Sequence, residues 1–173
     1  MKPATIATAT ITLAAVGFLL VANVSAAPRS GSTARSRPIQ LPPAAHVGET
    51  VLYGHIKSLT RKGKKFELQF DPAWWLGGVP AQRAAVQDKV IRPGEPVPND
   101  YYVVDESHRV FTYFVPTTTR VTVLDTRHLP NSVASRVDKL ARLVRVRTRF
   151  GFWIRVGKRY PSPVLSLDQQ YQP

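Results

Sequence analysis

Few side chains in this sequence are placed to do chemistry together. The four histidines are His46, His55, His108 and His128, and no two of them have the short helical spacing typical of a metal site. His108 directly follows Ser107, but neighbouring residues of a strand point to opposite faces, so the two do not pair as base and nucleophile. We expect His55 and His108 to lie on strands as packed residues. The sequence therefore gives no catalytic residue, no metal ligand and no cofactor.

One acidic cluster is the exception, and it is the basis of an alternative function. Asp100, Asp105 and Glu106 lie close together in the sequence, with Glu95 nearby. Two carboxylates can act as the acid and base of a glycosidase, or can bind calcium. Asp105 also begins a segment where a turn is expected, and turns favour aspartate. The alternative is a secreted hydrolase that acts on a cell-wall or glycan substrate through Asp100 to Glu106, but we favour a protein that is not an enzyme.

Aromatic side chains offer a second kind of site. Trp74 and Trp75 are adjacent, and exposed tryptophans can stack on sugars or bases. We take Trp74, Trp75, Tyr101 and His108 as candidate ligand-binding residues. The structural interpretation is that the pair splits, with one ring covering the edge of the core and the other partly exposed.

The elements that must position these residues are mostly strands. Residues 49–60 and 66–70 alternate in hydrophobicity around a basic turn at 61–65, which predicts a hairpin. Gly54 indicates a bulge or a bend within the first strand. We expect Asp71 to end the second strand, and residues 79–90 to form a helix with Pro80 in its first turn. The stretch from Asp100 to Leu124 predicts three short strands.

The region that follows has two competing periodicities. Residues 132–145 have apolar positions at steps of three and four with Ser132 as a cap, which predicts a helix. From Val144 to Val156 the apolar positions alternate, which predicts a strand. We expect the helix to run to about Leu143 and the strand to begin at about Thr148, with residues 164–171 as the closing strand. The candidate contacts to a polyanion are the cations of this region: Arg136, Lys139, Arg142, Arg145, Arg147 and Arg149.

Positive charge is concentrated in the last third of the chain. Residues 48–119 hold 9 basic and 8 acidic side chains, whereas residues 120–159 hold 11 basic ones against Asp125 and Asp138. Such a surface favours an anionic polymer of the cell envelope or lipid headgroups as the partner. We do not expect nucleic acid as the partner, because outside a cell anionic polymers and lipid headgroups are commoner than nucleic acid. The competing interpretation is a solvated cationic surface with no ligand.

The first residues have the pattern of an export signal. Lys2 precedes an apolar run from Ile11 to Val24 that ends in small residues, so we expect a signal peptide over 1–27. A disordered linker rich in Pro, Ser and Arg then covers 28–47, and one β-rich domain covers 48–173. The chain has no cysteine, which excludes disulfides and thiolate sites. We expect a secreted protein with no membrane span after cleavage; the alternative is tethering by an uncleaved signal anchor.

Four motifs carry a resemblance that covers the chain from about His46 to its end. They are Phe70-Asp-Pro-Ala-Trp-Trp-Leu76, Val97-Pro-Asn-Asp-Tyr-Tyr102, Gly151-Phe-Trp-Ile154 and Ser166-Leu-Asp-Gln-Gln-Tyr-Gln-Pro173. As a set they resemble a family of exported actinobacterial proteins of unknown function. The resemblance implies an export signal, a variable linker and a compact β-rich domain with a helical insertion, and it supplies no catalytic residue. Between Leu124 and Gly151 this chain is shorter and richer in arginine than that pattern.

These observations predict a β-rich α+β fold. We expect about six antiparallel strands in a single small sheet or partly open barrel, with a helix inserted after the second strand and another before the final hairpin. The function that we expect is binding or structural and not enzymatic, at or outside the cell envelope, with contact to an anionic polymer through the basic last third.

Overall fold

The structure, a computed structural model, describes residues 42–106, 108–146 and 151–172, all within the compact unit that spans residues 37–173. Eight strands are present: β1 (Glu49–Lys62), β2 (Lys65–Gly77), β3 (Tyr101–Val104), β4 (Phe111–Pro116), β5 (Arg120–Leu124), β6 (Ser132–Ser135), β7 (Gly151–Gly157) and β8 (Val164–Gln169). The helices are α1 (Gly78–Gln87), α2 (Val137–Val146) and the 3-10 turn η1 (Pro98–Asp100). The β-rich α+β class and the places of both helices are confirmed, with two strands more than expected.

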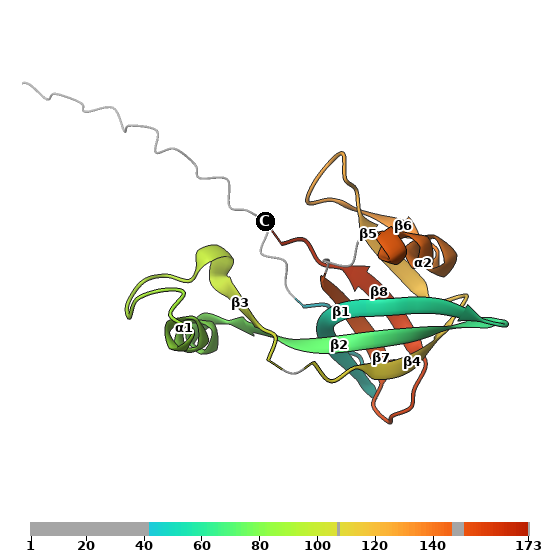
Figure 1. The fold of residues 1–173 in the computed structure, drawn as a ribbon, viewed down its shortest axis with the longest axis horizontal. Coiled ribbons are helices and arrows are strands. Elements are labelled where there is room, and N and C mark those ends of the chain that lie inside the picture. Colours follow the sequence, from blue (N-terminus) through green and yellow to red (C-terminus); the bar gives the residue numbers. More distant parts are fainter. Residues whose placement is uncertain (1–41, 107, 147–150, 173) are drawn as a thin grey trace, which may run out of the picture. The chain divides into compact units, whose positions relative to one another are not determined.

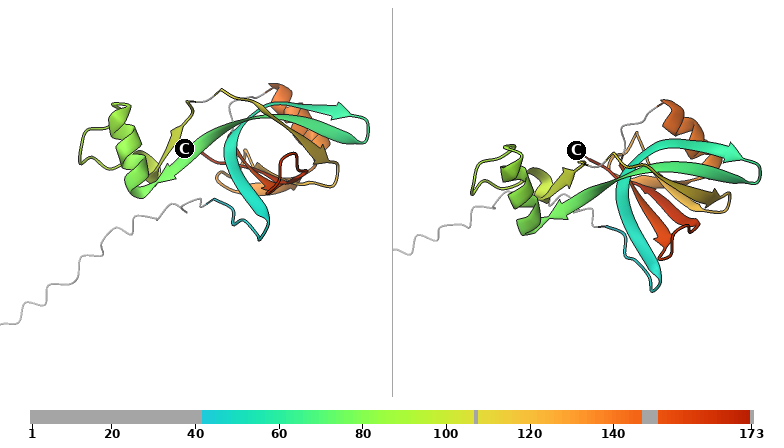
Figure 2. Two further views of the ribbon diagram at one scale, coloured as in Figure 1. Left: turned by 90° about the horizontal axis from the view of Figure 1, so that it is seen from below. Right: turned by 60° about the horizontal axis from the view of Figure 1, so that its bottom comes forward.

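The strands form one open sheet in the order β3-β2-β1-β7-β8-β5-β6, and β4 also pairs with β2. The sheet curls around its own core without closing into a barrel (Figure 2). Most pairs are antiparallel, but β5 pairs with β8 in parallel through residues 120–122 and 166–168. The expectation of a wholly antiparallel sheet was therefore wrong at this pair, because the chain crosses from β5 to β8 by way of β6, α2 and β7.

The β1–β2 hairpin is the longest feature of the sheet (Figure 1). Its turn lies between the paired residues Lys62 and Lys65, and Gly63 takes a φ of 64° there, a value that glycine adopts without strain. Strand β2 does not end at Asp71 as the sequence suggested. It continues to Gly77, because β1 pairs with it as far as Ala73 and β3 pairs with it from Trp74 onward.

The core lies between the inner face of the curled sheet and α2. The helix buries positions separated by three and four residues, and packs them against β1 and β5. The helix begins only at Val137: residues 132–135 form β6 and pair with β5, so Ser132 is not a helix cap. The buried apolar residues of this core are Ile56, Leu59, Phe66, Leu68, Phe70, Tyr113, Val115, Val121, Val137, Leu140, Ala141, Val144, Phe152, Ile154, Val156, Val164 and Leu167.

One edge of β2 carries two strands in succession. Strand β4 pairs with residues 65–70 and β3 pairs with residues 74–77, so three residues of β2, Asp71 to Ala73, have no partner on this edge. The opposite segment, residues 105–110, has six residues for the same interval. We call it the 105–110 loop. Because it has twice the residues that pairing would need, it must leave the edge of the sheet between its two strands.

No helix in the described ranges 42–106, 108–146 and 151–172 has the length and apolar character needed to cross a membrane.

Candidate functional site

The outer face of the sheet, opposite the core, carries an aromatic cluster that begins at Tyr53. Tyr53 lies opposite Ala73 of β2 and opposite Trp153 of β7, so side chains of three strands meet at one place. The Tyr53 ring lies 4.9 Å from that of Trp75 and 5.0 Å from that of Trp153, measured between centroids. Tyr101 of β3 stacks on Trp75 at 3.9 Å with the planes 15° apart. Four strands are thus joined by ring contacts on this face.

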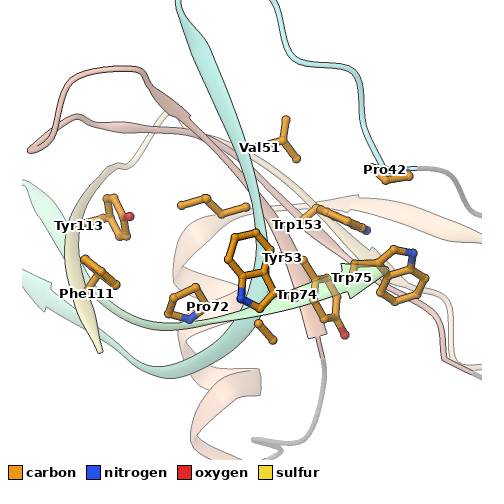
Figure 3. Close-up of a pocket in the computed structure, with 11 residues that line it drawn as sticks. Pro42, Val51, Tyr53, Pro72, Trp74, Trp75, Phe111, Tyr113 and Trp153 are labelled. Atoms are coloured by element: carbon orange, nitrogen blue, oxygen red, sulfur yellow. The ribbon is translucent and has the colours of Figure 1, made fainter. Parts of the chain in front are cut away.

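A cavity of about 590 Å³ opens beside this cluster. We call it the aromatic cleft, and its lining carries no charged side chain among the described residues: Pro42, Val51, Leu52, Tyr53, Pro72, Ala73, Trp74, Trp75, Phe111, Tyr113 and Trp153. In Figure 3, Phe111 and Tyr113 lie at one end of the view and Trp75 and Trp153 at the other, with Tyr53, Pro72 and Trp74 between them. Trp74 is 71% exposed, although tryptophan has the largest apolar ring of any side chain. An exposed ring beside an apolar cavity of this size is typical of a ligand site.

One hydrogen bond orients a side chain in the wall of the cleft. The indole Nε1 of Trp153 donates a hydrogen bond to Oε1 of Gln170 at 2.7 Å, which sets the orientation of that ring. Near Phe111, the guanidinium of Arg109 lies 5.1 Å from the ring centroid, so one positive charge is close to the cleft. The cleft therefore combines an apolar lining with a cation close to one of its lining residues.

A group of polar side chains lies next to the cleft, where the 105–110 loop passes Asp71. We call Asp71, Asp105 and His108, with His55 and Lys57 beside them, the carboxylate–histidine cluster. Lys57 is the bulged residue of β1, and its Nζ lies 2.8 Å from Oδ2 of Asp71. Nδ1 of His55 lies 3.5 Å from Oδ2 of Asp105, and Nδ1 of His108 lies 3.9 Å from Oδ2 of Asp71. These five residues come from three segments and no short sequence motif links them.

The basic side chains of α2 form a separate surface. Arg136, Lys139, Arg142 and Arg145 are all exposed on or next to this helix, and we call them the basic face. Asp138 pairs with Arg136 at 3.1 Å and with Arg142 at 3.6 Å, so it neutralises part of the charge. Arg61 of the β1–β2 hairpin and Arg136 line the same small cavity. The four basic residues at the hairpin tip therefore extend the basic face: Arg61, Lys62, Lys64 and Lys65.

Only two of the four candidate ligand-binding residues line the aromatic cleft. Trp74 and Trp75 line the aromatic cleft, and the predicted split is confirmed, because Trp74 is exposed and Trp75 is half-buried. Tyr101 supports Trp75 from behind and does not line the cleft. His108 was expected on a strand but lies in the 105–110 loop, near Asp71 and not in the cleft. His55 does lie on a strand, β1.

The remaining candidate residues, which are basic and acidic, also lie in different parts of the chain. Arg147 and Arg149 lie outside the described residues, as does the expected join near Thr148; α2 itself extends past Leu143 to Val146. In the acidic cluster, Asp100 ends η1 and Asp105 follows β3, so the two lie at opposite ends of that strand. The hydrolase alternative stays a prediction, and the carboxylate that the structure brings to Asp105 is Asp71.

Sequence reasoning missed Tyr53, Trp153 and Phe111 as cleft residues, and Asp71 as a site residue. Tyr53 and Trp153 were assigned only to strands, and their pairing depends on the β1–β7 register. The signal that could have found them is an aromatic residue on the alternating face of each strand: Tyr53 in β1, and Trp153 two positions after the glycine that opens β7.

Comparison with protein-family models, with curated proteins and with solved structures found no match to this chain. The site must therefore be interpreted from its own geometry.

Tyr53 gives the first testable prediction, because its buried hydroxyl has no hydrogen-bond partner among the described residues. Burial raises the pKa of this phenol, and Tyr101 and Asp105 raise it further. Tyr53→Phe removes an unsatisfied polar group, so we expect the free energy of unfolding at pH 7 to increase by about 1 kcal/mol in urea titrations.

The pH dependence follows from the same shift. A tyrosine in the unfolded chain ionises near pH 10, whereas the folded protein resists ionisation. The ionisation of Tyr53 should therefore leave the free energy of unfolding of the wild type unchanged below about pH 10 and lower it above that pH. Tyr53→Phe should reduce this decrease. Tyr160→Phe is the control: its exposed hydroxyl donates to the Thr112 carbonyl at 3.0 Å, so its loss should not stabilise. A Tyr53→Phe protein less stable than wild type at pH 7 would contradict this interpretation.

Proposed function

We propose that this chain is an exported, non-enzymatic binding module of the cell envelope, and that it takes the apolar part of an anionic envelope amphiphile in the aromatic cleft. The observation that carries the proposal is the cleft of about 590 Å³ with Trp74 exposed beside it. Leaving such a ring in water is unfavourable, whereas covering it with an apolar group regains roughly 1.5–3 kcal/mol. A secreted location and a signal peptide over 1–27 belong to this proposal, as does the family resemblance.

The chemistry of the lining favours an acyl chain or similar apolar group over a free sugar. Sugar sites present several hydrogen-bonding side chains to the ligand's hydroxyls, whereas the cleft is lined by aliphatic and aromatic residues, with Tyr53 and Tyr113 bearing its only side-chain hydroxyls among the described residues. The Tyr53 hydroxyl is itself buried. Arg109, beside Phe111, can meet the charged end of such a ligand. An anionic amphiphile satisfies both features.

The basic face supports the anionic half of the proposal. Lys139 and Arg145 have no acidic partner among the described residues, so their charge is available to a ligand. The hairpin tip at Arg61 to Lys65 adds more cations beside Arg136. We propose that lipid headgroups or an anionic envelope polymer contact this face, which is distinct from the cleft.

The cleft is tested by a fluorescence titration with a long-chain fatty acid. The tryptophans of the cleft should report binding, and Trp74→Ala should weaken it about 10-fold to 100-fold because the largest exposed ring is lost. Val133→Ala on β6 shortens an exposed apolar side chain that does not line the cleft and serves as the control. Binding of a neutral oligosaccharide without binding of the fatty acid would overturn the assignment of the ligand.

The basic face is tested with vesicles that contain an anionic phospholipid. Changing Lys139, Arg142 and Arg145 to Gln should weaken binding about 100-fold at low salt, since each cation near such a surface contributes about 1 kcal/mol. The matched control changes Arg83, Lys89 and Arg92 to Gln, which removes the same charge from the α1 region. Equal losses in the two triple variants, or binding that ignores ionic strength, would contradict a defined basic face.

A further inference from the structure

The carboxylate–histidine cluster has a geometry that the proposed function does not use. Asp71, Asp105 and His108 each offer one ligand atom, and these atoms all lie within 4.8 Å of one another. The arrangement follows from the excess length of the 105–110 loop. The loop has six residues where β2 has three, which gives it the length to leave the edge of the sheet, and Asp105 and His108 lie close to Asp71.

Asp71 is the unusual member of this cluster. It is fully buried, with 0% exposure, and neither of its carboxylate oxygens accepts a hydrogen bond from any described residue. Lys57 Nζ lies at 2.8 Å from Oδ2 but outside hydrogen-bonding geometry, and the 3.9 Å to His108 is too long for a hydrogen bond. Buried carboxylates are nearly always hydrogen-bonded, paired or bound to a metal. The ammonium of Lys57 balances the charge of Asp71 but leaves Oδ1 without a partner.

The other side of the cluster is open to solvent. The His108 side chain is 79% exposed and that of Asp105 is 34% exposed, so an ion and its waters can reach Asp71 from outside. His55 lies against Asp105 at 3.5 Å, where it can orient that carboxylate as the outer partners of metal ligands commonly do. The cluster thus has a buried carboxylate, an accessible second carboxylate and an exposed imidazole.

We propose that this cluster is a binding site for a divalent transition-metal ion of the zinc class, held by one oxygen of Asp71, one oxygen of Asp105 and one imidazole nitrogen of His108. Mixed carboxylate and imidazole ligands at about 2.0–2.2 Å suit such ions, and water completes the coordination. The exposed His108 is the ligand that moves inward to reach these distances. Two carboxylates against one ammonium leave a net negative charge that favours the cation.

The competing interpretation is a buried Lys57–Asp71 ion pair with no metal. The two differ in the part that Lys57 plays. In the ion-pair interpretation Lys57 is required to compensate Asp71, and its loss destabilises the fold by an amount that added metal does not restore. In a metal site Lys57 competes with the ion for Asp71, so its removal favours binding.

Isothermal titration of Zn²⁺ into the chelator-treated full chain, purified without a histidine tag, tests the site. We expect one stoichiometric site, and at least 10-fold weaker binding in His108→Ala and in Asp105→Asn. Both residues are exposed, so these variants should fold. His128→Ala is the matched control, because His128 and Asp125 form an exposed histidine–aspartate pair at 2.8 Å with no third ligand.

Lys57→Met provides the second readout. We expect it to bind Zn²⁺ more tightly than wild type, and Zn²⁺ to raise its melting temperature by more than that of wild type. The proposal is overturned if wild type takes up no stoichiometric Zn²⁺, if His108→Ala and His128→Ala bind equally well, or if Zn²⁺ leaves the melting temperature of Lys57→Met unchanged.

Discussion

The close approach of β1 to β2 at Gly54 is the constraint on which both faces of the sheet depend. Gly54 lies opposite Pro72 on one side and opposite Phe152 on the other, so it is the point where β2, β1 and β7 are held together. A Cβ atom at this position would collide with the main-chain carbonyl of Asp71 and would lie 2.7 Å from Cα of Pro72. Only glycine permits this contact, and with it the curvature of β1 that is visible in Figure 2.

The functional features are direct neighbours of that contact. Tyr53, on one side of Gly54, supports the aromatic cleft, and His55, on the other, lies against Asp105. The same approach fixes Asp71, whose side chain turns to the outer face while Phe70 enters the core. One crossing of strands therefore places the ring cluster around Tyr53, which forms part of the cleft lining, beside the polar cluster on the outer face. The basic face, on α2, is positioned separately by the core.

Local patterns in the sequence were sufficient for much of the fold. The β1–β2 hairpin, both helices and the strands of residues 100–124 each have a periodicity or turn that is contained within the segment. Residues 132–135 were assigned wrongly because Val133 fits a helical and an alternating pattern equally well. What decides between them is pairing with β5, which is a tertiary contact. The parallel β5–β8 pair was missed for the same reason.

The candidate site was less predictable, because it depends on register. Trp74 and Trp75 stand out by residue type, whereas Tyr53 and Trp153 become neighbours only when β1 pairs with β7. Asp71 and Asp105 are far apart in the sequence, and they meet because the segment opposite Asp71 to Ala73 is three residues too long for the edge of β2. No composition or spacing rule shows such an excess before the strand pairing is known.

The unfolding free energy of Gly54→Ala, measured by chemical denaturation beside that of Gly77→Ala, tests most directly whether the close approach at Gly54 holds the sheet together. At Gly77 an added Cβ meets nothing closer than the Asp100 carbonyl at 3.9 Å, and we expect a loss below about 1 kcal/mol. At Gly54 the collision is with main chain, which cannot move aside, so we expect a loss of at least about 2 kcal/mol. A Gly54→Ala protein as stable as Gly77→Ala would contradict the claim that this crossing holds the sheet together.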